Sequence, residues 1–258
     1  MAVATETVGD PAHVLSVRGI TKLYGGLRAV DALSFSVERG EIFGIAGPNG
    51  AGKTTLFDAL TGHVTASSGA IDLAGASIRG TKIHHRVRLG LARTFQHPVA
   101  ADTLTVLENA YLAASFQRGR PRFRARASDI AAGRAALDVV GLGDCADTPA
   151  GALRVYDKKL LMMATAIATD PLVLLLDEPF GGLSPLEIET TIGIIRRIRD
   201  SGVAVVCIEH VMRALVALSD RVLVMHHGSE LFLGTPQEMV KDPAVVSVYL
   251  GSGRGAGA

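Results

Sequence analysis

The segment GPNGAGKTT at residues 47–55 restricts what this chain can fold into more than any other feature of its sequence. It fits the pattern GxxxxGK[ST], in which backbone N–H groups surround phosphate oxygens and glycines permit the curled backbone. We expect an apolar strand before it at 41–46 and a helix after it at 53–61, whose positive end attracts the same anion. A glycine-rich turn without a ligand is the alternative, and this flanking context disfavours it. The predicted phosphate-binding residues are Gly47, Pro48, Asn49, Gly50, Ala51, Gly52, Lys53, Thr54 and Thr55.

An acidic pair further along the chain completes the predicted site. The run LVLLLDEP at 172–179 indicates a buried strand that delivers Asp177 and Glu178 at its carboxyl end, where open α/β sheets place ligands. Asp177 can hold Mg²⁺ directly or through water, together with the Thr54 hydroxyl, and Glu178 can polarise an attacking water. Taken alone, the two residues can simply end a strand. Beside a phosphate loop, they predict metal-dependent hydrolysis of a nucleotide.

The order of apolar segments predicts an α/β fold. Buried runs alternate with helical segments, which indicates a mainly parallel sheet covered on both faces. Residues 14–37 alternate apolar and polar residues and predict antiparallel strands, whereas residues 97–152 are alanine-rich and helical in period. A helix from Ser184 to Ser201 has strong punctuation, because Ser184 and Glu187 form the pattern of a capping box.

Charge and composition exclude several classes of partner. The 258 residues include 26 basic and 25 acidic ones, a net charge of 26 − 25 = +1, which gives no general attraction to nucleic acid. The two cysteines lack the spacing of a metal cluster. Uninterrupted apolar runs stay far below the roughly 20 residues of a membrane span. A mean hydropathy of +0.32 is high for a free monomer and predicts surface buried by a partner.

Two single residues gain interest from their positions. Gln96, in ARTFQ, can bridge a metal ion to the helical segment that follows it, and His210, in VVCIEH, follows a buried strand and can bond a γ-phosphate. Alone, a loop glutamine is usually solvated and a lone histidine is more often structural, so the residues themselves leave both roles open. The histidine pairs at 84–85 and 226–227 lack ligand spacing and are interpreted as surface or turn residues.

In sequence order, these motifs resemble those of the ATP-binding cassette (ABC) ATPases over about residues 14–250. The ordered set is Tyr24, GPNGAGKTT, Gln96, a helical insert, LVLLLDEP, GLSP and His210. Finer features are similar to the subfamily that powers branched-chain amino acid uptake: YGGLRAV, GPNGAGKTTLFDALTG, GLARTFQ, GLSP and GTPQEMVKDPAVVSVYLG.

The resemblance implies a P-loop NTPase (RecA-like) core with an antiparallel β subdomain and an α-helical subdomain. It implies one domain at 13–250, with the helical part inserted at about 97–170; residues 1–12 and 251–258 are expected to be disordered. ATP and Mg²⁺ would be the cofactors, with metal ligands Thr54, Gln96 and Asp177. Tyr24 would stack on adenine, Glu178 would be the catalytic base, and Gln96 and His210 would complete the catalytic set.

The resemblance also implies partners and a location. They are two transmembrane permease subunits, a second ABC ATPase subunit and, indirectly, a substrate-binding protein, at the cytoplasmic face of the inner membrane. The transported substrate would be a branched-chain or related amino acid. The dense basic run at 119–126 falls in the helical insert, where it can touch acidic lipid headgroups or a permease, or simply be a solvated loop.

One segment departs from the family pattern. The signature LSGGQ is expected 24 residues before Asp177, and that position holds Leu153-Arg154-Val155-Tyr156-Asp157. In the family this segment contacts the γ-phosphate bound to the partner of a head-to-tail dimer. Side chains at 155 and 156 would obstruct that approach, and the carboxylate of Asp157 would repel the phosphate. We therefore predict a heterodimer with one degenerate site. The alternative is a working homodimer in which Arg154 and Lys158 substitute for the signature.

Other functions remain as alternatives at this point. One is a soluble ABC ATPase of translation or DNA maintenance, although such proteins usually carry tandem cassettes or coiled-coil insertions. Another is a regulatory nucleotide-binding module with low turnover, which the altered signature favours and the presence of Glu178 and His210 disfavours. Ser184, where many family members have an acidic or amide residue, weakens communication across the dimer or serves only as a helix cap.

Overall fold

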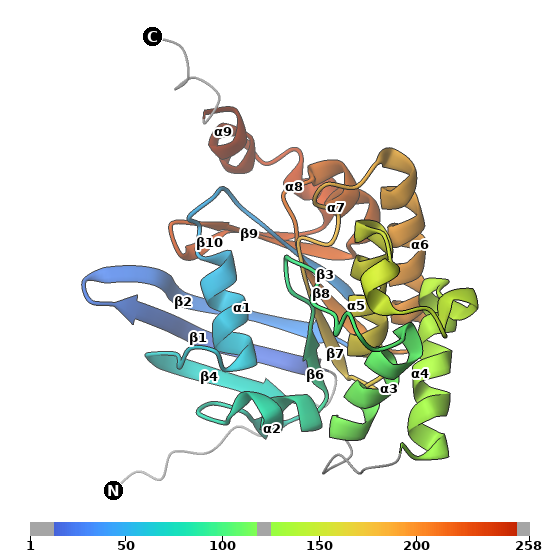
Figure 1. The fold of residues 1–258 in the computed structure, drawn as a ribbon. Helices are drawn as coiled ribbons and strands as arrows, with labels where there is room; N and C mark the ends of the chain where they lie inside the picture. Colours follow the sequence, from blue (N-terminus) through green and yellow to red (C-terminus); the bar gives the residue numbers. More distant parts are fainter. Residues whose placement is uncertain (1–12, 118–124, 252–258) are drawn as a thin grey trace, which may run out of the picture.

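The computed structural model describes residues 13–117 and 125–251. The expectations for residues 1–12 and for most of 251–258 therefore lie outside the described residues, as does most of the basic run at 119–126. Within the described part, two sheets and a group of helices form the α/β fold that the sequence predicts (Figure 1). No helix in these two ranges is both long and apolar enough to cross a bilayer.

The central sheet has six strands in the order β10-β9-β3-β8-β7-β6. Strand β3 pairs in parallel with β8 and β9, and β7 pairs in parallel with β8 and β6, so the carboxyl ends of these strands meet at one edge. Only β10 runs antiparallel, as the second strand of a hairpin with β9. The strands span β3 (Ile42–Ala46), β6 (Leu91–Arg93), β7 (Val173–Asp177), β8 (Ala204–Ile208), β9 (Arg221–His226) and β10 (Ser229–Gly234).

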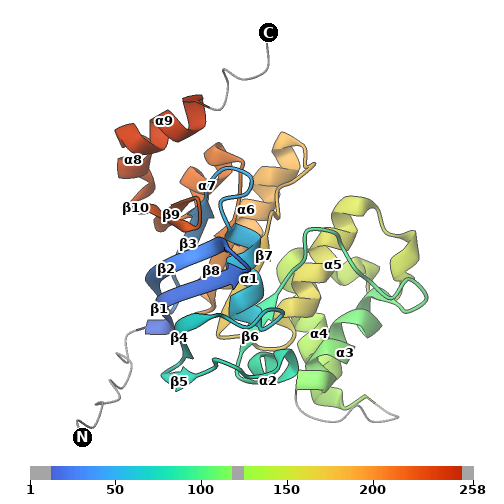
Figure 2. The ribbon, with the colours of Figure 1, turned by 90° about the vertical axis from the view of Figure 1, so that its left-hand side faces the viewer.

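The second sheet is antiparallel and covers one face of the central sheet. Its order is β2-β1-β4-β5, and helix α1 (Lys53–Thr61) lies beside it (Figure 2). The buried apolar side chains of α1 share one core with residues of both sheets. Phe35 of this sheet stacks on Phe43 of β3 with ring centroids 5.1 Å apart, which joins the two layers directly. The strands span β1 (His13–Tyr24), β2 (Leu27–Glu38), β4 (Ser68–Leu73) and β5 (Ala76–Ser77).

Helices cover the other face of the central sheet. Side chains of α3, α4, α5 and α6 share one apolar core with Leu174, Leu176 and Val205, and Figures 1 and 2 both place α3–α5 away from the antiparallel sheet. These helices span α3 (Val106–Gln117), α4 (Ala127–Val140), α5 (Val155–Ile167) and α6 (Pro185–Asp200). The remaining helices are α2 (Ile83–Arg88), α7 (Met212–Leu218), α8 (Pro236–Met239) and α9 (Pro243–Gly251), with 3-10 turns at Gly143–Cys145 and Ala150–Ala152.

The punctuation of α6 follows the predicted chemistry. The Ser184 hydroxyl accepts a hydrogen bond from the Glu187 backbone N–H, and the Glu187 carboxylate accepts one from the Ser184 backbone N–H, which completes the capping box. These bonds satisfy N–H groups that the first turn of a helix leaves without a partner. They also hold the pKa of the Glu187 carboxyl below its usual range, because the hydrogen bonds favour its charged form.

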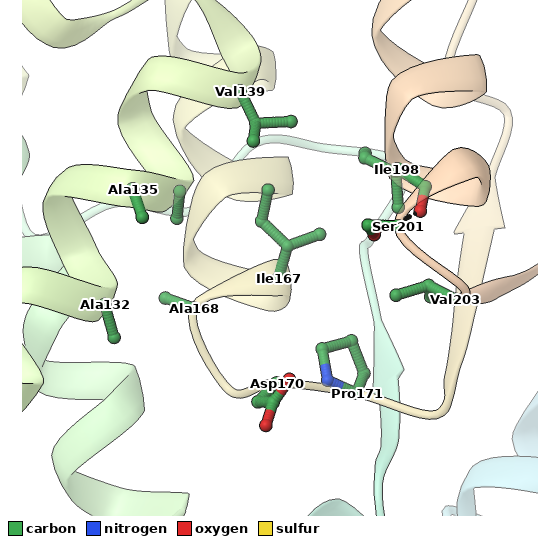
Figure 3. A pocket seen from close by; sticks show the side chains of 11 residues that line it. Ala132, Ala135, Val139, Ile167, Ala168, Asp170, Pro171, Ile198, Ser201 and Val203 are labelled. Carbon is green, nitrogen blue, oxygen red and sulfur yellow. Dashed lines mark hydrogen bonds between the residues drawn. The ribbon is translucent and has the colours of Figure 1, made fainter.

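A hollow of about 260 Å³ lies between α4, the end of α5 and α6 (Figure 3). Ile167 points into it between the alanines of α4 and Ile198 of α6, and Asp170 and Pro171 lie at one end. The described residues that line it include the acidic Asp170 and none that is cationic, so this hollow lacks the positive charge that favours a phosphate. A nucleotide therefore belongs elsewhere on the molecule.

Two glycines inside helices predict opposite effects of the same substitution. Alanine normally stabilises a helix interior by up to about 1 kcal/mol over glycine. At Gly133, however, a Cβ would lie 2.9 Å from the backbone nitrogen of Tyr111, where α3 and α4 touch. We expect Gly133→Ala to lower the free energy of unfolding by about 1–2 kcal/mol, since overpacking costs about 1–3 kcal/mol. Gly193→Ala in α6, with nothing within 4 Å, should raise it by about 0.5–1 kcal/mol.

Urea unfolding of the two variants and the parent chain checks this pair. The sign of the change in the free energy of unfolding at Gly133 tells which effect is larger, because helix propensity favours alanine and the contact with Tyr111 disfavours it. A more stable Gly133→Ala variant would show that α3 and α4 do not meet as closely as described.

Candidate functional site

The phosphate loop connects β3 to α1 and depends on three glycines in the left-handed region. Their φ angles are +146° at Gly47, +80° at Gly50 and +98° at Gly52, conformations that side chains disfavour. Two of the glycines also allow close approach of other backbone. A Cβ on Gly47 would collide with the carbonyl oxygen of Met225, and one on Gly52 with that of Ala29. The loop is therefore wedged between β9 and β2.

Lys53 is the first residue of α1 and is buried under the loop. Its Nζ donates hydrogen bonds to the carbonyl oxygens of Gly47, at 2.6 Å, and Pro48, at 3.0 Å. Burial lowers the pKa of this ammonium, while the nearby charges of Glu178 and Asp177 oppose the shift. A cation at the start of a helix, beneath a glycine-rich loop, is an arrangement that binds phosphate.

A cavity of about 540 Å³ opens over this loop. Tyr24, at the end of β1, lines it and is 47% exposed, with the Lys22 ammonium 4.8 Å from the centre of its ring. An exposed aromatic ring beside a phosphate loop can stack on a base. The cavity lining comprises Tyr24, Leu27, Arg28, Ala29, Asn49, Gly50, Ala51, Gly52, Lys53, Thr54, Thr55, Glu178 and His227.

Three residues predicted from the sequence meet at one carboxylate. Glu178 follows β7 and His210 lies just beyond β8, and the parallel pairing of Asp177 with Ile208 brings both strand ends together. The Gln96 side-chain amide donates to Glu178 Oε2 at 2.8 Å, and His210 Nδ1 lies 3.8 Å from the same oxygen. An acid, an amide and an imidazole that converge beside a phosphate loop can orient a water molecule and accept its proton.

Asp177 has a partner that sequence reasoning missed. Arg93, at the end of β6, donates to Asp177 Oδ2 at 2.7 Å and to Asp58 of α1 at 2.6 Å. The parallel pairing of β6 with β7 places Arg93 opposite Leu175, two residues before Asp177. The buried guanidinium also lies near the rings of Phe57 and Phe95. The apolar and polar pattern of the sequence does not reveal the ion pair between Arg93 and Asp177, because that contact depends on which strands are neighbours in the sheet.

The residues predicted as metal ligands have the chemistry that a magnesium ion prefers. A carboxylate, the Thr54 hydroxyl and the Gln96 amide are hard ligands of the kind that Mg²⁺ prefers. In the described ranges, no group of three or more His, Cys, Asp or Glu side chains is arranged to hold a metal alone. Mg²⁺ commonly takes one or two protein carboxylates and completes its shell with phosphate oxygens and water, so this sparse set suits it.

His227 is a further cavity residue, although its sequence context indicates only a surface or turn residue. It forms a two-residue hairpin turn with Gly228 between β9 and β10, with φ angles of +48° and +84°. The turn packs against the phosphate loop, since Gly228 N–H donates to the carbonyl oxygen of Ala51 at 3.0 Å. The pattern around residue 227 carries no signal for this contact with residue 51.

The segment 153–157 begins α5, with Arg154 as the residue before its first turn. Asp157 accepts two hydrogen bonds from the Arg154 guanidinium, at 2.7 and 3.1 Å. Val155 is 70% exposed, whereas Tyr156 is half-buried with its hydroxyl 3.4 Å from that of Thr191 in α6. The outward face of the segment therefore carries a paired arginine and a valine.

Comparison with known proteins decides the family. The family model described as ABC transporter matches residues 30–181, more than half of the chain. The chain belongs to the ABC transporter family. It is 36% identical over 250 residues to the high-affinity branched-chain amino acid transport ATP-binding protein BraF of Pseudomonas aeruginosa, covering 92% of this chain and 98% of BraF. LivG of Escherichia coli K12, with the same description, has the same identity and coverage.

Solved structures of ATP-binding cassettes have the same fold as this chain. An ATP-binding cassette of an ABC transporter, crystallised in its ADP conformation, superposes with a TM-score of 0.84 at 26% identity, covering 93% of this chain and 99% of that one. A second is cbiO1 from Clostridium perfringens, part of the ABC transporter complex cbiONQ, with a TM-score of 0.80 at 25% identity, covering 93% and 97%. The protein is thus an ATP-binding ABC transporter ATPase with the cassette fold.

Proposed function

We propose that this ATPase energises an importer for branched-chain or related amino acids, as one half of a head-to-tail dimer of nucleotide-binding subunits. Its partners would be two transmembrane permease subunits, a second ATPase subunit and, indirectly, a substrate-binding protein, at the cytoplasmic face of the inner membrane. The similarity to BraF and LivG over nearly the whole of each protein supports the substrate class. The convergence of Gln96 and His210 on Glu178 beside the phosphate loop carries the proposal of hydrolysis.

In this proposal, each residue of the cavity and of the strand ends beside it has one task. The loop 47–55 binds the phosphates through its N–H groups and Lys53, and Tyr24 stacks on the adenine. Thr54, Asp177 and Gln96 hold Mg²⁺, which neutralises charge on the phosphates when bound. Glu178 orients the attacking water and takes its proton. His210 donates a hydrogen bond to the γ-phosphate.

The contacts of segment 153–157 support a heterodimer with one degenerate site. Arg154 is paired with Asp157 through two of its guanidinium nitrogens, so a phosphate bound to the partner would meet the carboxylate of Asp157 together with the charge of Arg154. Lys158 does not substitute for it, because its ammonium pairs with Asp102 at 2.9 Å. Lys159 is turned inward and donates to the carbonyl oxygen of Gly181 at 2.6 Å. A partner with an intact signature would complete the site formed by this chain's own phosphate loop.

Purification of the tagged full chain from native membranes tests the proposal. We expect permease subunits and a second ATPase with an intact signature to copurify in equal amounts, and the complex to hydrolyse ATP. Copurification of permeases with two copies of this chain would overturn the heterodimer. Recovery of the chain alone, with low turnover, would favour a regulatory or non-transport ATPase, a function that the altered segment 153–157 also allows.

A further inference from the structure

Glu209 is a buried carboxylate that the proposed chemistry does not use. It directly follows β8 and is fully buried, with 0% of its surface exposed. Burial raises the pKa of this carboxyl, and hydrogen bonds from backbone N–H groups oppose the shift. A buried carboxylate persists in a fold only where such bonds compensate for its loss of water.

The three hydrogen bonds of Glu209 join two loops. Oε1 accepts from the backbone N–H of Phe180 at 2.9 Å, and Oε2 accepts from those of His210 and Val211, each at 3.0 Å. Phe180 lies two residues after Glu178. His210 is the residue whose Nδ1 lies 3.8 Å from the Glu178 carboxylate. One carboxylate therefore fixes the backbone on both sides of the predicted catalytic centre.

The backbone of Glu178 needs such support. Its φ angle is +48°, a left-handed conformation that costs a non-glycine residue about 1–2 kcal/mol. The conformation is fixed on both sides, because the Glu178 N–H donates to the carbonyl oxygen of Ile208 at 3.0 Å and Glu209 binds Phe180 just beyond. Strain of this kind persists only where the surroundings over-determine the backbone.

Lys159 holds the same loop from the other side. Its Nζ donates to the carbonyl oxygen of Gly181, the residue after Phe180, so a carboxylate and an ammonium bind two peptide groups of the same short loop. Burial lowers the pKa of the Lys159 ammonium, and the charge of Glu209 opposes this shift. The loop that starts at Glu178 is thus tied both to β8 and to α5.

We propose that Glu209 is a positioning residue for ATP hydrolysis: its buried carboxylate holds the loop after Glu178 and the loop of His210 as one unit, so that both side chains face the same phosphate. The inference rests on the proposed function. Glu209 touches neither nucleotide nor water in this role. A displacement of about 1 Å in a catalytic group can cost roughly 100-fold in rate, so loosening the two loops should lower turnover.

The test substitutes Glu209→Gln in the full chain, within the native assembly. An amide keeps the shape but presents an NH₂ group to one of the two loops, where backbone donors already point at it. We expect kcat to fall tenfold to hundredfold and the Kd for ATP to change less than twofold. Glu209→Asp, which keeps the charge but is one methylene shorter and can reach only one loop, should show the same split.

Glu41→Gln is the matched control. Glu41 is likewise buried, its pKa is likewise raised by burial, and it accepts bonds from the backbone N–H of Glu38 and from Arg221. It precedes β3, at the opposite end of the sheet from the loops, because Ile42 pairs with Val205 and Ile45 with Ile208. We expect Glu41→Gln to lower stability and leave kcat within twofold of the parent.

Amide hydrogen exchange separates failure of this inference from failure of the proposed function. In the full chain without nucleotide, Glu209→Gln should speed exchange at 178–183 and 209–212, and Glu41→Gln should not. Unchanged exchange there, or a kcat within twofold of the parent, would overturn the inference. A parent assembly that does not hydrolyse ATP would contradict the proposed function. The hydrogen-exchange rates would still decide whether Glu209 holds the two loops together.

Discussion

Glu178→Gln is expected to lower kcat for ATP hydrolysis by at least about 100-fold and to leave the Kd for ATP within about twofold. The substitution keeps the size of the side chain and its contact with Gln96, but an amide cannot accept a proton. General-base catalysis contributes about 10²–10⁴ to a rate, which sets the size of the loss. The phosphate loop and Tyr24, which are proposed to bind the nucleotide, are unchanged. Steady-state hydrolysis by the native assembly and equilibrium binding of ATP measure the two quantities.

The control for this experiment is Glu189→Gln, a carboxylate exposed on α6. It removes the same charge from the chain without touching the cavity, so kcat should stay at the parent value. If Glu178→Gln kept more than a tenth of the parent kcat, the base would have to be another group. In the proposed heterodimer, Glu178→Gln disables the one competent site. The kcat of the assembly should therefore fall well below half of the parent value, the level that a second working site would maintain.

Local patterns in the sequence predicted the elements that hold the site. A few neighbouring residues suffice to predict the turn of the glycine-rich loop before α1, the capping box of Ser184 and the buried strand that ends at Asp177. The structure has these elements where the sequence predicts them. The same holds for the fold class, since alternating apolar strands and helices leave few arrangements of a parallel sheet. The confirmed part of the fold is therefore the part that short-range chemistry determines.

The missed residues depend on strand order instead. Arg93 reaches Asp177 because β6 is the neighbour of β7, and Glu209 reaches Phe180 because β8 is its other neighbour. His227 lines the cavity because the β9–β10 turn packs on the phosphate loop. Nothing near these residues in the sequence records such contacts. Charged residues at strand ends were nevertheless a usable signal, since parallel strands deliver them to one edge.

The structure also refines how the altered signature segment is understood. The sequence left Arg154 and Lys158 as cations that would substitute for the signature. In the structure Arg154 pairs with Asp157 and Lys158 pairs with Asp102, while the neighbouring Lys159 donates to the carbonyl oxygen of Gly181. Tyr156, expected to obstruct a phosphate, leans toward α6, so Val155 is the side chain left at the exposed start of the helix.

Gly52→Ala is expected to lower the free energy of unfolding by more than about 3 kcal/mol and to abolish measurable ATP binding. Two costs combine at this residue. A φ angle of +98° is unfavourable for alanine by about 1–2 kcal/mol, and the new methyl group would collide with the carbonyl oxygen of Ala29. Overpacking of the methyl group against this backbone adds about 1–3 kcal/mol.

Gly50→Ala separates the two costs within the same loop. Gly50 has a φ angle of +80° and nothing within 4 Å of its added Cβ, so it carries only the dihedral cost of about 1–2 kcal/mol. Chemical unfolding without nucleotide compares the two variants, because a methyl group at either residue can also obstruct the phosphates. Equal losses would mean that the loop does not press on β2. A larger loss at Gly52 would show that its contact with Ala29 sets the distance between the phosphate loop and β2. Because β2 pairs with the strand that ends at Tyr24, the same contact would set the distance between the phosphate end and the base end of the cavity.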